Sequence, residues 1–164
     1  MIFKLILYIV FFLNIFTFLP FCFLGLLNYR SDEIVSKYLI NNFYYQLIWF
    51  VINFINSIIN LYAFIDNSIN IDIKENILLY SIYEGLFLFL LYIVNSNYYM
   101  GRYFFQHILS FFIYTYLIKI CIETKRPYFA KNHPISFYLY LPYTFWIFYL
   151  AFINFDTIYL SLIN

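Results

Sequence analysis

The sequence predicts an all-α integral membrane protein with about five transmembrane helices in a single domain, residues 1–164. Two properties of its composition support this fold class. Apolar residues make up 65% of the chain and charged residues 10%, and the mean hydropathy is +0.80. Soluble domains are about 25% charged, so this chain lacks the charge to cover a globular surface in water. A third observation is that five long apolar stretches alternate with short segments that hold most of the charges.

The positions of the helices follow from the length of a membrane span, about 20 predominantly apolar residues. The stretches that meet or approach this length are residues 5–27, 43–65, 77–94, 103–122 and 136–158. We interpret the segments between them as loops, namely residues 28–38, 66–76, 95–102 and 123–134. The first stretch follows Lys4, and a basic residue before an apolar stretch is also typical of a secretory signal peptide, which is the alternative interpretation. No small-residue cleavage site follows it in FLPFCFLGLLNYR, which favours an uncleaved helix.

Lysine and arginine are distributed unevenly between the two predicted sides of the membrane. With five spans, the N-terminus and the second and fourth loops share one side. That side holds Lys4, Lys74, Lys119, Lys125, Arg126 and Lys131. The opposite side holds only Arg30, Lys37 and Arg102. Loops on the side from which a protein inserts are enriched in these residues, so we expect the N-terminus on the side with six basic residues.

One face of the second predicted helix carries amide side chains. Their spacings of 4, 7, 3 and 4 residues correspond to a period of about 3.5, with Trp49 in the wide gap. The residues are Asn42, Gln46, Asn53, Asn56 and Asn60. Chance placement in an Asn-rich chain is the alternative, and it explains their number but not their shared face. Because amides in a membrane hydrogen-bond across helices, we predict that this face is a helix–helix interface.

Glu84 lies inside the apolar stretch YSIYEGLFLFLLYIVN, where an ionised carboxylate is costly unless it is paired or functional. It lies seven residues into its predicted helix, a depth of about 10 Å. Lys119 lies near the corresponding end of the next, antiparallel helix, so the two residues have similar depths. We therefore predict an intramembrane pair of Glu84 and Lys119. Contact with a partner subunit and a role in a proton relay are the alternatives.

The sequence shows no pattern that indicates catalysis, a metal or a cofactor of its own. It contains no nucleophile–base pair, phosphate-binding loop or metal-ligand cluster, and Cys22 and Cys121 both lie in apolar stretches. Two-histidine haem ligation would need a partner for His107 at the same depth, but His133 lies in a loop on the other side. A net charge of +1 without a basic tract gives no indication of nucleic-acid binding. We therefore expect a non-enzymatic membrane protein.

The amino-acid composition of the chain is itself similar to that of a known class of proteins. The chain has 23 Phe, 20 Tyr, 28 Ile and 15 Asn but only 3 Gly, 4 Pro, 3 Ala and 3 Arg, which is typical of an AT-rich gene. In this style it resembles the membrane subunits of respiratory complexes that ciliate-type mitochondrial genomes encode. The resemblance implies the mitochondrial inner membrane, an N-terminus in the matrix, and other membrane subunits of a respiratory complex as partners. A nuclear gene of an AT-rich parasite is the alternative.

Two local matches name particular complexes. Glu84 with Phe87 and Phe89 resembles the third helix of cytochrome c oxidase subunit III, although the serine before the glutamate and the tryptophan and histidine after it are missing. The stretch IYEGLFLFLLYIVN resembles the third helix of NADH dehydrogenase subunit 6 but lacks about one turn after its glycine. These matches imply a non-catalytic subunit of a respiratory complex. Cytochrome c oxidase is the preferred complex, and NADH dehydrogenase is the alternative. An ATP synthase membrane subunit, a small transporter and an assembly factor are further alternatives.

The basic segment ETKRPYFAKNHP is the last feature with a predicted contact. Lys125, Arg126 and Lys131 lie in this segment, on the predicted matrix side. Anionic phospholipid headgroups attract basic residues close to a membrane surface. We expect these three side chains to contact a lipid such as cardiolipin or a neighbouring subunit.

Overall fold

The computed structural model describes residues 36–66, 69–96 and 103–163, and all regular elements in these ranges are helical. The prediction of an all-α fold is therefore confirmed for this part of the chain. The elements are α2 (Asn42–Ile65), α3 (Ile71–Ser96), α4 (Tyr103–Ile120), the π-helix η2 (Cys121–Lys125), α5 (Arg126–Asn132) and α6 (Pro134–Ile163). The predicted helix 5–27 and Cys22 lie outside the described residues.

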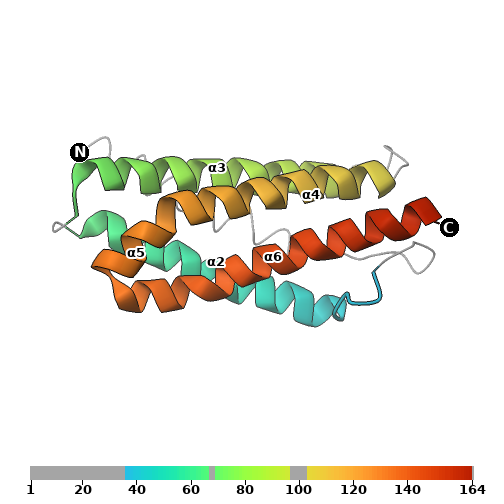
Figure 1. The fold of residues 1–164 in the computed structure, drawn as a ribbon, viewed down its shortest axis with the longest axis horizontal. Coiled ribbons are helices and arrows are strands. Elements are labelled where there is room, and N and C mark those ends of the chain that lie inside the picture. The colour runs from blue at the N-terminus through green and yellow to red at the C-terminus, as the bar shows by residue number, and fades with distance from the viewer. Residues whose placement is uncertain (1–35, 67–68, 97–102, 164) are drawn as a thin grey trace.

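The four long helices run antiparallel along the long axis of the molecule (Figure 1). Helix α2 packs against α3 and α6, and α4 packs against the same two helices. These pairings place the four helices around a shared interior. The short helix α5 lies at the end of the bundle where α2 leads into α3 (Figure 1). Side chains that point inward from all four helices can therefore meet one another.

The predicted helices agree closely with the structure, but two predicted loops are largely helical. The segment 66–76 contributes the first turn and a half of α3, which begins at Ile71 and has Asp72 in its first turn. An acidic side chain at that position stabilises the helix, because its negative charge lies near the positive end of the helix dipole. The segment 123–134 forms the end of η2 and the whole of α5, with Pro127 in the first turn of α5, where proline is well tolerated. Charge and proline, interpreted as loop signals, instead mark helix starts here.

Two helices in the described part are long and apolar enough to cross a membrane, namely Leu47–Ile65 within α2 and Pro134–Ile163, which is the whole of α6. Helix α6 continues through Pro142, although proline removes a backbone donor from the helix. Such interruptions are tolerated in membrane helices because neighbouring groups satisfy the freed carbonyl. Length and composition thus give partial support for the predicted membrane spans.

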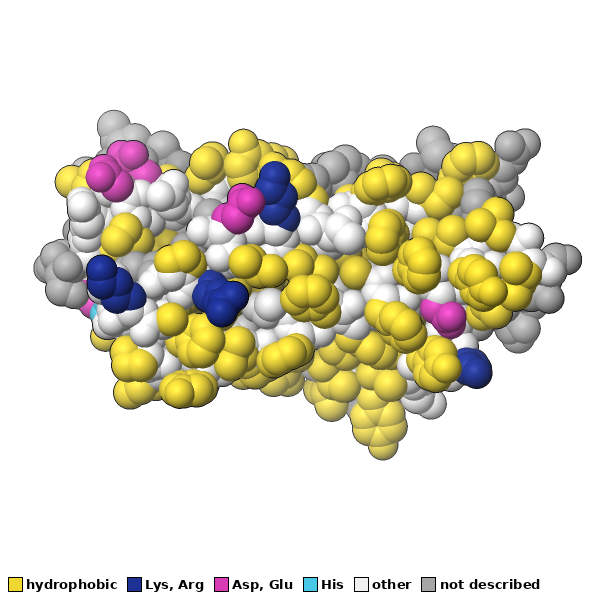
Figure 2. Space-filling model, in the orientation of Figure 1, with side chains coloured by type: hydrophobic (Ala, Val, Ile, Leu, Met, Phe, Trp, Pro, Cys, Tyr) yellow, Lys and Arg dark blue, Asp and Glu magenta, His cyan; other side chains and the backbone are white. Residues whose placement is uncertain are grey.

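Many polar side chains are buried beside the apolar core, and many large apolar side chains lie on the surface. Twelve polar or charged side chains are buried in the described residues, and apart from Ser36, which precedes α2, they come from the four long helices and from η2. Large apolar side chains are exposed, such as Phe145 and Phe112, whose exposed fractions are 68% and 63%. On the face drawn in Figure 2, apolar side chains cover much of the surface, and charged groups lie among them, most of them in the left half. The interior is therefore rich in hydrogen bonds, and the exterior is suited to an apolar surrounding.

Candidate functional site

Three fully buried side chains from three elements form the most polar site in the described interior. Glu84 of α3, Asn56 of α2 and Lys125 of η2 have exposed fractions of 2%, 1% and 0%. The Asn56 amide nitrogen donates to both carboxylate oxygens of Glu84, at 3.0 and 3.2 Å. The Lys125 ammonium donates to the Asn56 amide oxygen at 2.7 Å. We call this arrangement the amide-bridged cluster, because Asn56 lies between the two ionisable groups and joins them.

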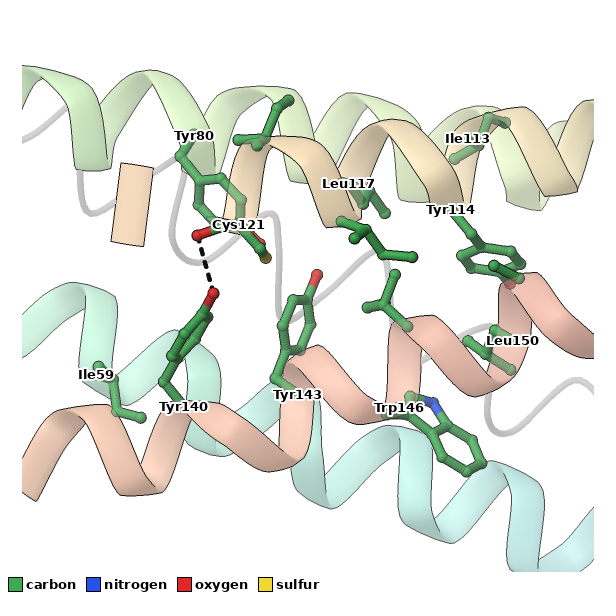
Figure 3. Close-up of a cluster of buried hydrophobic side chains, with 14 of the residues drawn as sticks. Ile59, Tyr80, Ile113, Tyr114, Leu117, Cys121, Tyr140, Tyr143, Trp146 and Leu150 are labelled. Atoms are coloured by element: carbon green, nitrogen blue, oxygen red, sulfur yellow. Dashed lines mark hydrogen bonds between the residues drawn. The ribbon is translucent and has the colours of Figure 1, made fainter. Parts of the chain in front are cut away.

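Tyrosine rings surround the cationic end of the amide-bridged cluster. The Nζ atom of Lys125 lies 3.7 Å from the ring centroid of Tyr80, and 5.3 and 5.7 Å from those of Tyr143 and Tyr140. Figure 3 shows Tyr80 reaching from α3 toward Tyr140 and Tyr143 of α6. An aromatic face attracts a cation, and the attraction is stronger where water is excluded. The rings therefore supply part of the stabilisation that Lys125 loses by leaving water.

The π-helix η2 connects these tyrosines to α4 through Cys121. The Tyr140 hydroxyl donates to the carbonyl oxygen of Cys121 at 2.9 Å, and the Tyr80 hydroxyl lies 3.1 Å from the Cys121 sulfur. Both contacts are buried and join helices that are distant in sequence. Single-turn π-helices occur often at functional sites, where they alter the direction of side chains. Here the π-helix ends at Lys125, the residue that completes the cluster.

The structure places a different lysine beside Glu84 from the one predicted by depth. Lys119 has an exposed side chain, whereas Lys125 interacts electrostatically with Glu84 in the interior. The predicted pair of Glu84 and Lys119 is therefore corrected to Glu84 and Lys125, joined by Asn56. The physical reason is rotation about the helix axis. Lys119 precedes the buried Cys121 by two residues, which turns it about 200° away from the interior.

This placement also corrects the contact predicted for Lys125 with lipid headgroups or a neighbouring subunit. Its side chain is enclosed by the bundle, while Arg126 and Lys131 are exposed. A sequence signal for Lys125 did exist. Tyr114, Leu117, Cys121 and Lys125 are spaced by 3, 4 and 4 residues and are all buried. The pattern is one continuous inner face, and the prediction that the helix ends at residue 122 concealed its last member.

The amide face of α2 is directed into the bundle where the structure describes it. Asn53, Asn56 and Asn60 are buried, whereas the side chains of Asn42 and Gln46 lie outside the description. Asn56 forms the bridge of the cluster. The side-chain oxygen of Asn60, one turn further on, makes no hydrogen bond with any described residue. The three described amides are thus equally buried but unequally bonded, which provides a matched comparison.

A second polar contact joins α4 to α6. The Nδ1 atom of His107 lies 2.8 Å from the side-chain oxygen of Asn154, whose amide nitrogen donates to the carbonyl oxygen of Leu150 at 2.8 Å. An amide oxygen can only accept, so Nδ1 carries the imidazole proton in this contact. His133 instead lies 3.6 Å from Asp66 at the α5 end. Within the described ranges, no group of three potential metal-ligating side chains occurs.

Replacing Asn154 with leucine should destabilise the protein by about 1–3 kcal/mol, because it leaves the buried imidazole N–H of His107 without this acceptor. The free energy of unfolding in mixed micelles, followed by circular dichroism, measures the loss. Asn76→Leu is the control, since Asn76 is exposed on α3. Equal losses in the two variants would show that the His107–Asn154 contact contributes nothing.

Comparison with known proteins provides no further assignment. No family model matches the sequence, no curated protein matches it, and no solved structure matches it. The chemistry of the described residues is therefore the basis for inference. It consists of a buried carboxylate and a buried ammonium that share one amide, inside a bundle whose exterior is apolar.

Proposed function

We propose that this chain is a non-catalytic transmembrane subunit of a mitochondrial respiratory-chain complex, with cytochrome c oxidase as the preferred complex. The observation that carries the proposal is the combination of polar side chains buried in the interior with large apolar side chains exposed on the surface. Polar side chains are expensive in lipid and are directed toward the inside of membrane proteins, where they pair with one another. The described helices follow this rule at the amide-bridged cluster and at the His107–Asn154 contact.

The exposed surface of α6 gives independent support for a lipid or protein environment. Its exposed aromatic side chains follow one another at intervals of 3, 4, 3 and 4 residues, so they form one ridge along the helix. The ridge consists of Phe145, Phe148, Phe152, Phe155 and Tyr159. A contiguous apolar ridge of this length is rare on a soluble monomer and marks a surface that lipid or another protein covers.

The proposed topology has five spans with the N-terminus in the matrix. Four spans correspond to the long helices, and residues 5–27, outside the described part, would form the other. The end of the bundle that holds α5 carries the exposed Arg126 and Lys131. Basic residues concentrate on the side from which a membrane protein inserts, so this end faces the matrix. In this position the two side chains could contact cardiolipin or a neighbouring subunit.

A structural role agrees with the way in which the interior is bonded. The amide-bridged cluster joins α2, α3 and η2, and the His107–Asn154 contact joins α4 and α6. Hydrogen bonds between membrane helices are worth about 0.6–2 kcal/mol each, enough to select one packing among several. A bundle fixed in this manner would provide a rigid surface for the catalytic subunits of a complex.

Native-gel separation of mildly solubilised mitochondrial membranes, followed by mass spectrometry, tests the proposal. We expect the chain at a constant ratio to the catalytic subunits of the band with oxidase activity. A constant ratio to NADH dehydrogenase or to ATP synthase would keep the subunit proposal and change the complex. Presence only in incomplete precursors of a complex would identify an assembly factor. Absence from all of these bands would overturn the proposal.

A small transporter is the second candidate, because polar side chains from several helices converge inside the bundle. Asn56, Glu84, His107 and Asn154 come from four different helices and are all buried. Reconstitution of the purified chain into vesicles discriminates this candidate. Solute flux that the Glu84→Gln variant abolishes would favour a transporter. Solute flux equal to that of empty vesicles would argue against a transporter and favour the proposal that the polar interior has a structural role in a subunit.

A further inference from the structure

We propose that the amide-bridged cluster is a proton-binding site in the membrane interior, at which the Glu84 carboxylate accepts and releases a proton while Asn56 and Lys125 remain in place. This goes beyond the proposed function, which requires the cluster only for packing. It does not depend on which complex contains the chain. The ligand is the hydrogen ion: one O–H bond forms on a carboxylate oxygen, no other covalent bond changes, and the cluster gains one positive charge.

The first argument is that the hydrogen bonds tolerate both forms of Glu84. Asn56 donates two hydrogen bonds to the carboxylate, and no direct ion pair joins Glu84 to Lys125. A protonated carboxyl group retains a carbonyl oxygen that can accept from the same amide. A lysine bonded directly to the carboxylate would lose its partner on protonation. With Asn56 between them, the Lys125–Asn56 bond is independent of the proton on Glu84.

The second argument is that Lys125 has cation stabilisation other than Glu84. Its ammonium lies 3.7 Å from the centre of the Tyr80 ring and bonds to the neutral Asn56 oxygen at 2.7 Å. A desolvated cation–π contact is worth about 2 kcal/mol. The tyrosine rings therefore hold the positive charge in place when Glu84 is neutral. A buried cation without such partners would strongly oppose protonation of the Glu84 carboxylate.

The third argument concerns the hydroxyl groups near Glu84. Five titratable or polar groups face it from the elements packed around it: Asn56 from α2, Tyr80 from its own helix, Lys125 and Cys121 from η2, and Tyr143 from α6. The Tyr143 hydroxyl interacts with the Glu84 carboxylate from the opposite helix. A hydroxyl can rotate to donate to a carboxylate or to accept from a carboxylic acid. Tyr143 can thus serve either form of Glu84.

Infrared difference spectroscopy of the full chain in lipid nanodiscs tests the proposal. The pH is stepped between about 6 and about 9, a range well above the ordinary pKa of an exposed carboxyl group. We expect a carbonyl band of a carboxylic acid that appears and disappears reversibly. The Glu84→Gln variant should lose this band. The Glu75→Gln variant should keep it, because Glu75 is exposed on the same helix.

If the Glu84→Gln variant does not fold, labelling with carboxyl-¹³C glutamate shows that the titrating group is a glutamate, and persistence of the band when Glu33, Glu75 and Glu123 are all replaced by glutamine assigns it to Glu84. In the wild-type chain the titrating band should then move to lower frequency, and the Glu75→Gln control should show the same shift. The proposal is overturned if no carboxylic-acid band changes across this range, if the band lacks the isotope shift, or if it persists in a folded Glu84→Gln protein. Any of these outcomes would leave the cluster as a static packing contact.

Discussion

Replacing Lys125 with methionine is expected to lower the free energy of unfolding by about 3–5 kcal/mol, the largest effect of any single change at the cluster. The substitution removes the cation that faces Glu84 and leaves the buried carboxylate with neutral neighbours alone, the Asn56 amide and two tyrosine hydroxyls. Methionine is apolar and has a similar length to lysine, so it leaves little empty space. The loss of stability therefore measures removal of the charge rather than formation of a cavity. Unfolding of the purified chain by dodecyl sulfate in mixed micelles, followed by circular dichroism, measures the effect.

Lys119→Met is the matched control, because Lys119 is an exposed lysine on α4. Its loss should stay within about 0.5 kcal/mol, the range for surface substitutions. The double variant Glu84→Gln with Lys125→Met should recover most of the loss, since no buried charge then lacks a partner. Equal stability of the Lys119→Met and Lys125→Met proteins would contradict the structure at this site. A larger loss for Lys119→Met than for Lys125→Met would instead support the pairing that depth alone predicts.

The predicted partner of Glu84 shows what the sequence can and cannot give. Depth depends on where the helix begins, and α3 begins at Ile71 rather than at residue 77, so Glu84 lies further into its helix than predicted. Direction about the helix axis depends on which residues face inward, because successive residues differ by about 100°. Treating residues 123–134 as a loop removed Lys125 from the helix. Lys119 was then the only lysine left to pair with Glu84.

The long helices were easier to predict than the short ones. The predicted helix 43–65 differs from α2 by one residue, because a continuous apolar stretch with an amide face is an unambiguous pattern. Helix α5 contains Arg126, Pro127 and Lys131, whose types are equally common in loops. Helix α5 packs against α6, and this tertiary contact stabilises it as a helix. Such a contact is not visible in the local sequence. Segments of this kind therefore escape prediction by composition.

The amide face of α2 is the part of the site that periodicity did locate, but periodicity does not rank its members. Asn53, Asn56 and Asn60 share one face and are all buried. Only a structure shows that Asn56 reaches both Glu84 and Lys125, since these come from helices distant in sequence. The three amides would look equivalent in any calculation based on spacing. Their energetic contributions should nevertheless differ widely.

Replacing Asn56 with leucine is therefore expected to cost about 3 kcal/mol of unfolding free energy, because two buried charged groups lose their hydrogen bonds at once. Leucine has a branched shape like asparagine but a larger volume, so the substitution also adds a packing cost. The same substitution at Asn60 should cost less than about 1 kcal/mol or stabilise the protein, because it removes an amide oxygen that has no described partner. The dodecyl sulfate titration used for Lys125 compares the two variants directly.

The comparison between the two leucine variants isolates hydrogen bonding from burial. Both asparagines are buried on α2, with exposed fractions of 1% and 4%, and they lie one turn apart. If burial of an amide were the dominant cost, both substitutions would stabilise the chain in an apolar surrounding. If the bridge to Glu84 and Lys125 dominates, the variants should differ by about 2 kcal/mol or more. Two variants of equal stability would mean that Asn56 does not join the charges, and the proton-binding site would lose its central residue.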